Sequence, residues 1–256
     1  MRRRLTAEIL IVLGLSLGQS AVYSVIALAD RLSRDTSLGE QVATLNPSRS
    51  SREVFDLLYQ LLGTAFALVP IALVCYLLWS SAAPRLGRLG IDWRHPGRDA
   101  GVGLGLALAV GVVGIGVYLG GRALGLTVAI DPSGLGAYWW TVPVLLLAAL
   151  RAGIEEEVIA VGYLAARLRE LGWCDWPIIL LSAGIRATYH LYQGVGPFVG
   201  NLLMGLLFGW LFLRGPAWFR GRTLPLVVAH VVIDAVAFTA YPLAAALWPG
   251  LFGLPG

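Results

Sequence analysis

Long apolar segments recur along this 256-residue chain, and they restrict its possible folds more than any other feature. A helix that crosses a bilayer needs about 20 predominantly apolar residues. Only 13% of the residues are charged, whereas about a quarter are charged in a soluble domain. The sequence therefore predicts an all-α, polytopic membrane helix bundle of about eight transmembrane helices, at 8–29, 55–79, 100–121, 138–168, 176–193, 197–213, 224–241 and 242–253.

A single integral membrane domain over 1–256 is expected, because no internal repeat and no low-complexity tail divides the chain. The basic start resembles a signal peptide, but the apolar run behind it is longer and no small-x-small cleavage motif follows, so we expect a retained first span. Cys75 and Cys174 are far apart and form no CxxC motif, which argues against a disulfide framework or a thiolate metal site.

Arginine supplies all the basic side chains, since the chain has no lysine. In the loops of a membrane protein, arginine indicates orientation and lipid contact, so no nucleic acid partner is expected. With a cytoplasmic N-terminus, the inner loops hold most of the arginines, which favours both termini inside. We expect a multi-pass cell-membrane protein, and the arginine-only, Gly- and Ala-rich composition favours a bacterial inner membrane.

Ionisable residues inside the apolar segments indicate where function should be sought, because charges are costly at membrane depth and usually face a cavity or a partner. Three of them are consecutive glutamates in IEEEVIAVGYL (154–164). The whole set of ionisable residues at membrane depth is Arg151, Glu155, Glu156, Glu157, Arg186, His190, His230 and Asp234. At a rise of about 1.5 Å per residue, four of them from three separate spans, Glu156, His190, His230 and Asp234, fall in one slab near the midplane.

Carboxylates and two imidazoles around one point are the groups that the activation of water requires. A glutamate can take a proton from water, and a histidine can orient the water or donate to a developing oxyanion. His230 and Asp234 are four residues apart and share a helix face, as do Arg186 and His190. A structural alternative is that each histidine only joins helices through hydrogen bonds.

Three motifs in order, EEVIAVGYL (156–164), RATYHLYQG (186–194) and HVVID (230–234), resemble the CPBP family. That family comprises CAAX prenyl endopeptidases and bacteriocin-processing or immunity proteins, with the pattern EExxxR, FxxxH and HxxxN or HxxxD. The resemblance covers about 100–245, which would be the catalytic core. It implies an intramembrane endopeptidase that cleaves a membrane-associated, CAAX-like peptide or protein.

The resemblance also implies a role for each matching residue. Glu156 would be the general base and Glu157 its companion. His190 would hold the attacking water, and His230 and Asp234 would stabilise the oxyanion.

Two positions depart from the family pattern. The arginine of the first motif is Val161 here, and the phenylalanine of the second motif is Arg186. We expect Arg186 to pair with Glu156 or Glu157 and so to support the site in place of the missing arginine; the alternative is that it extends to the outer interface. Glu155 should instead pair with Arg151, four residues earlier on the same helix face.

Two rival functions remain. Two histidines with a carboxylate could hold a zinc ion and leave a fourth site for water, as in a zinc-dependent intramembrane protease. HExxH is absent, so no metal ligand and no cofactor is expected, with zinc as the alternative. The other rival is a non-catalytic binding or immunity protein, or a transporter that uses the slab as a proton site. The sequence indicates neither the identity of the substrate nor the oligomeric state.

Overall fold

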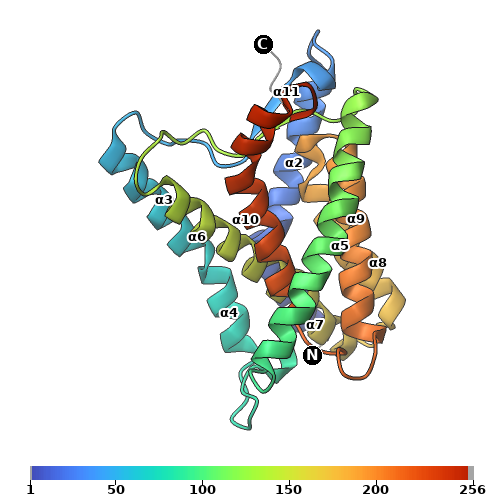
Figure 1. Cartoon of the computed structure of the whole chain (residues 1–256). Coiled ribbons are helices and arrows are strands. Elements are labelled where there is room, and N and C mark those ends of the chain that lie inside the picture. Colours follow the sequence, from blue (N-terminus) through green and yellow to red (C-terminus); the bar gives the residue numbers. More distant parts are fainter. Residues whose placement is uncertain (1, 253–256) are drawn as a thin grey trace.

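The computed structural model describes residues 2–252, apart from the side chains at positions 242, 245, 249 and 251. Most of it is helical, which confirms the predicted all-α membrane bundle (Figure 1). The α-helices are α1 (Arg2–Gly14), α2 (Leu17–Leu32), α3 (Glu53–Ala67), α4 (Val69–Leu77), α5 (Pro96–Ala123), α6 (Thr141–Glu156), α7 (Leu164–Glu170), α8 (Asp175–Tyr189), α9 (Val195–Arg214), α10 (Leu224–Leu247) and α11 (Pro249–Phe252).

Short elements complete the described chain. A π-helical segment, η3 (Glu157–Tyr163), joins α6 to α7, and 3-10 turns lie at η1 (Leu38–Glu40), η2 (Gly87–Leu89) and η4 (Leu191–Gln193). Strands β1 (Val42–Thr44) and β2 (Ala129–Asp131) pair in parallel, with Val42 opposite Ala129. This small sheet ties the segment after α2 to the segment after α5.

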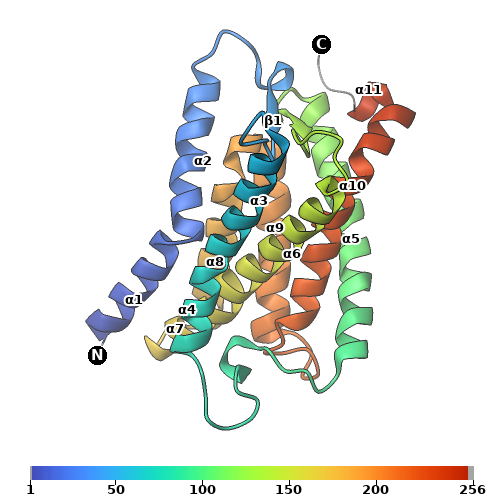
Figure 2. The same cartoon turned by 90° about the vertical axis from the view of Figure 1, so that its left-hand side faces the viewer.

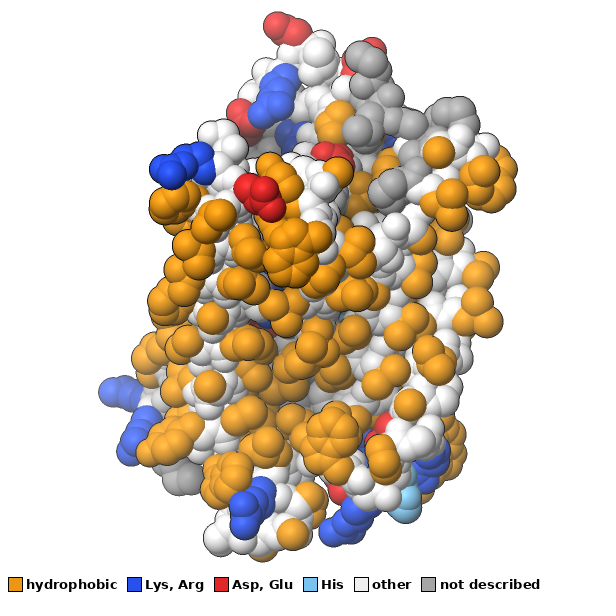
Figure 3. Space-filling view, turned by 60° about the vertical axis from the view of Figure 1, so that its left-hand side comes forward, with side chains coloured by type: hydrophobic (Ala, Val, Ile, Leu, Met, Phe, Trp, Pro, Cys, Tyr) orange, Lys and Arg blue, Asp and Glu red, His pale blue; other side chains and the backbone are white. Residues whose placement is uncertain are grey.

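Four helical segments of the described chain are long and apolar enough to cross a membrane, at Glu53–Leu77, Pro96–Ala123, Val195–Arg214 and Leu224–Tyr241. The bent pair α1 and α2 would make a fifth, with an angle of 55° between its halves. At this bend the carbonyl oxygen of Leu13 lies 2.7 Å from where a Cβ at Gly18 would be, so only glycine fits there. On the face seen in Figure 3, hydrophobic side chains cover the middle, and most charged side chains lie toward the two ends.

The C-terminal end differs from the expected one. We expected 242–253 to cross the membrane again, but α10 continues without a break to Leu247, and α11 stays at the same end of the bundle. Figures 1 and 2 show the start of α1 at one end of the molecule and α11 at the other. The two ends of the described chain therefore lie at opposite ends of the bundle, whereas we expected both termini on the cytoplasmic side. A segment of twelve residues is too short to cross about 30 Å of hydrocarbon as a helix. Residue 253 lies outside the described chain.

Close helix contacts bring the motif-bearing elements together. α10 packs against α5 and α6, and α8 packs against α9, α2 and η3. A Cβ at Gly153 in α6 would lie 2.6 Å from the Val231 side chain of α10, and a Cβ at Gly205 in α9 would lie 2.8 Å from Cα of Ala183 in α8. Glycine thus allows the backbones of α6 and α10, and those of α8 and α9, to approach closely.

The glycine-rich stretch 101–121 suggests close helix packing from its GxxxG-like spacing, but most of it faces open space. Within the stretch, the tight positions are Gly103, against Val228, and Gly121, against Thr127. The spacing that does serve a helix contact is that of Gly205 and Gly209, which face Ala183 and Ile179 of α8.

Gly205→Ala should lower the thermal unfolding midpoint of the purified protein in detergent. The added methyl group meets the backbone of α8, and overpacking of this kind costs about 1–3 kcal/mol. Gly184→Ala in α8 is the matched control, because nothing lies within 4 Å of its Cβ position. It should leave the midpoint unchanged or raise it. Equal midpoints for the two variants would show that the α8–α9 contact does not depend on glycine.

Candidate active site

A buried ion pair forms the centre of a polar network between α6, η3, α8 and α10. Nη2 of Arg186 donates to Oε1 of Glu157 at 2.6 Å, and both side chains are completely inaccessible to solvent. Nδ1 of His230 lies 2.7 Å from the same oxygen. Since this nitrogen donates its hydrogen to Glu157, it cannot accept one from Nη1 of Arg186, which lies 3.3 Å away. Arg186 and His230 therefore meet on one carboxylate.

Glu156 lies beside this pair and remains slightly accessible, with 13% of its side chain exposed. Its contacts within the described chain all fall on Oε2. The hydroxyl of Tyr189 donates to this oxygen at 2.5 Å, Nη1 of Arg186 lies 3.4 Å away and Nε2 of His230 lies 3.7 Å away. The other oxygen, Oε1, is therefore the part of Glu156 that can meet an incoming molecule.

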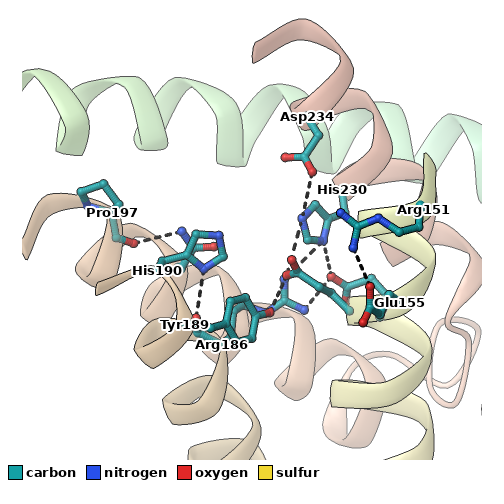
Figure 4. A network of polar contacts seen from close by, with 11 residues as sticks. Arg151, Glu155, Arg186, Tyr189, His190, Pro197, His230 and Asp234 are labelled. Carbon is teal, nitrogen blue, oxygen red and sulfur yellow. Dashed lines mark hydrogen bonds and ion pairs between the residues drawn. The ribbon is translucent and has the colours of Figure 1, made fainter. Parts of the chain in front are cut away.

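Asp234 completes one side of the network. Its Oδ2 lies 3.6 Å from Nε2 of His230, one turn earlier on α10 (Figure 4). Nε2 thus points toward two carboxylates, those of Asp234 and Glu156, while Nδ1 is held by Glu157. This arrangement fixes the plane of the ring and directs Nε2 toward Oε2 of Glu156.

His190 lies apart from this cluster. It follows the last residue of α8, and its Nδ1 lies 3.0 Å from the carbonyl oxygen of Arg186, to which it can only donate. Its ring lies against that of Tyr189, with 4.8 Å between the ring centres. No hydrogen bond within the described chain joins His190 to a carboxylate; in Figure 4 it is drawn to the left of the network.

Glu155 has a separate partner. Its Oε2 accepts a hydrogen bond from Nη1 of Arg151 at 2.7 Å, as the spacing of four residues predicted. The Arg186 pairing with both neighbouring glutamates is also the one expected, and Arg186 does not reach the outer interface. The three consecutive glutamates thus divide between two arginines.

The π-helical segment η3 explains how Glu156 and Glu157 contact the same arginine. Consecutive side chains of an α-helix point about 100° apart. The helix changes from α to π between these two residues, and wider turns of this kind often occur at functional sites. All of 157–163 is buried, and Gly162 lies so close to Leu89 that a Cβ would be 2.6 Å from its carbonyl oxygen.

Tyr189 belongs to the network but was missed by the sequence reasoning. It is the last residue of α8, buried, and its hydroxyl contacts Glu156 directly. The available signal was its place beside His190 in RATYH, where a phenol at membrane depth needs a hydrogen-bond partner. The motif comparison gave this position no weight, because the family pattern leaves it variable.

Two buried atoms of the network, Oε2 of Glu157 and Nε of Arg186, have no hydrogen-bond partner in the described chain. An unpaired buried polar atom costs free energy, and such atoms require an explanation other than packing. Together with two carboxylates around one guanidinium, they indicate a site kept for chemistry rather than for stability.

The zinc alternative would need the two histidines and a carboxylate to converge on one point. Within residues 2–252, no group of three or more His, Cys, Asp or Glu side chains is placed to hold a metal ion. The two imidazoles do not converge, because His190 bonds to its own helix while His230 bonds to Glu157. The Arg186 guanidinium already supplies positive charge to both glutamates.

A known protein family is similar to the part of the chain that carries this site. Residues 138–236, from the start of α6 into α10, match the family described as type II CAAX prenyl endopeptidase Rce1-like. The match is narrower than the expected core at 100–245, but it contains all three motifs. No curated protein and no solved structure matches the chain. Over residues 138–236 the helical membrane protein is therefore similar to the type II CAAX prenyl endopeptidases of the Rce1-like family, as its three motifs indicated.

Proposed function

We propose that this protein hydrolyses a peptide bond of a membrane-associated, CAAX-like substrate, with Glu156 as the general base. The observation that supports this most is the difference between Glu156 and Glu157. Glu157 is completely buried and bonded to Arg186 and His230, whereas Glu156 keeps an exposed edge next to the same cations. Only the carboxylate with an accessible oxygen can take a proton from a water molecule that attacks a substrate.

The remaining residues have roles that their contacts support. Since Nδ1 of His190 donates to a carbonyl group, Nε2 carries a lone pair and can accept a hydrogen bond from the attacking water. Nε2 of His230 donates to the oxyanion, and the negative charge of the nearby Asp234 carboxylate favours the protonated form of that nitrogen. Glu157 and Arg186 are positioning residues that hold His230 and Glu156 in place.

The reaction then proceeds in two steps. Glu156 takes one proton as the water oxygen bonds to the scissile carbonyl carbon, and the carbonyl oxygen becomes an oxyanion near His230. The C–N bond breaks as the oxyanion collapses, and Glu156 gives its proton to the departing nitrogen. The products are a free carboxyl group and a free amine, and Glu156 returns to its starting state.

Glu156→Gln should abolish cleavage of a farnesylated CAAX reporter peptide in proteoliposomes. A glutamine cannot take the proton, and loss of a general base typically lowers the rate by about 10²–10⁴-fold. Glu155→Gln is the control, because Glu155 pairs with Arg151 outside the network. It should keep most of the activity. An equal loss in both variants would contradict the assignment of the base, and a wild-type protein that binds the reporter without cleaving it would support the non-catalytic alternative.

Arg186→Phe, which restores the family's residue, should inactivate the protein. It leaves Glu157 as a buried carboxylate without its guanidinium, and breaking such a pair costs about 3–5 kcal/mol. Adding Val161→Arg should recover part of the activity. Val161 and Ser182 line the same small cavity, and Ser182 lies one turn before Arg186 on α8, so the new side chain can extend toward both glutamates.

The rescue separates positioning from simple stability. Thermal unfolding midpoints in detergent are measured for wild type, Arg186→Phe and the double variant alongside cleavage. A double variant that regains its midpoint but no cleavage would contradict the relocated-arginine role, and so would an Arg186→Phe protein that cleaves at the wild-type rate.

We also propose that hydrolysis needs no metal ion. Dialysis against a chelator should leave the cleavage rate unchanged, and elemental analysis of the active protein should find far less than one zinc per chain. The reason is the guanidinium of Arg186, which occupies the position beside both glutamates that a cation would need. Zinc at one per chain that disappears together with activity, and restores it when added back, would overturn this.

A further inference from the structure

A cavity of about 470 Å³ lies between α2 and the end of α8, outside the network of charged residues. Figure 2 shows α2 at the edge of the bundle, and α2 contacts both α8 and η4. The volume falls within the range of about 300–1,000 Å³ that is typical of ligand sites. The lining residues are Gln19, Ser20, Tyr23, Ser24, Ala27, Tyr189 and Tyr192.

The α2 wall of this cavity is polar, although α2 forms part of a candidate membrane span. Positions 19, 20, 23, 24 and 27 are spaced to lie on one helix face. Ser24 is buried and its Oγ accepts a hydrogen bond from the Tyr192 N–H at 2.8 Å, which fixes α2 against η4. Gln19, Ser20 and Tyr23 remain exposed on the same face. Polar side chains at membrane depth usually face a cavity or a partner.

Tyr189 connects the cavity to the proposed general base. Its side chain lines the cavity, and its hydroxyl donates to Oε2 of Glu156 at 2.5 Å. A single aromatic residue therefore lies between the cavity and the carboxylate. A molecule bound in the cavity along α2 would therefore extend to the neighbourhood of the Glu156 carboxylate.

We infer that this cavity is the groove that holds the substrate's peptide backbone in extended form next to the scissile bond. The inference rests on the proposed function. A peptide bond must leave helical structure before water can reach its carbonyl carbon, and an extended backbone in a bilayer leaves N–H and C=O groups without partners. The Gln19 amide offers donors and an acceptor, and the hydroxyls of Ser20 and Tyr23 offer both. α2 lies outside the matched residues 138–236, so the groove combines the family site with this chain's own N-terminal helix.

Kinetics of groove variants test the inference. Ala27→Trp fills the cavity and should raise KM for the farnesylated CAAX reporter about 10-fold or more, with kcat changed less than about 2-fold. Ser20→Ala, which removes a hydroxyl without adding bulk, should raise KM in the same direction. Val22→Trp is the matched control, since Val22 is on α2 but 61% exposed and outside the cavity lining, and it should leave both constants unchanged. An unchanged KM in both groove variants would overturn the inference.

Cross-linking separates this inference from the proposed function. The reporter carries a photoreactive residue just before its scissile bond and is bound to Glu156→Gln protein in proteoliposomes. Cross-links should map to positions 19–27, and adding Ala27→Trp should remove them. Cross-links there without any cleavage by wild type would contradict the proposed function and leave the groove standing. Cleavage by wild type with cross-links confined to other helices would overturn the groove alone.

Discussion

The ion pair between Arg186 and Glu157 is the interaction on which the other contacts of the site depend. Both side chains are fully buried, and the face of the molecule seen in Figure 3 is largely hydrophobic. Either charge alone would be too costly at this depth, so each requires the other. Together they fix the ring of His230 through Nδ1 and place a positive charge beside Glu156. The orientation of the proposed catalytic groups follows from this one pair.

Backbone geometry makes the pair possible. The change from α6 to the π-helical η3 lets two consecutive glutamates meet one guanidinium, and Gly153 and Gly205 let α10 and α9 approach closely enough to support it. Arg186 comes from the last turn of α8, where the helix ends and the chain turns toward α9. We propose that Arg186 replaces the arginine of the family's first motif, whose position is occupied by Val161 in this chain.

Much of the candidate site could be predicted from the sequence, because ionisable residues in apolar segments are rare and therefore informative. The pairing of Glu155 with Arg151 follows from helical spacing alone. The approach of Arg186 to Glu156 and Glu157 followed from the need of a buried guanidinium for a carboxylate. Tyr189 was not predicted, because nothing in the local sequence distinguishes a phenol that forms a hydrogen bond from one that only packs. The separation of His190 from the carboxylates could not be predicted either, because it depends on where α8 ends.

The sequence by itself determined that the chain is a helical membrane protein and which charges lie within it, because hydrophobicity and charge are properties of single residues and short segments. Tertiary structure alone decided which glutamate is enclosed and which is accessible, since this depends on which helices pack against α6 and η3. It also decided that α10 continues rather than crossing back, and that a polar face of α2 lies beside Tyr189. These three features depend on contacts between segments that are far apart in the chain, and a local sequence pattern carries no information about such contacts.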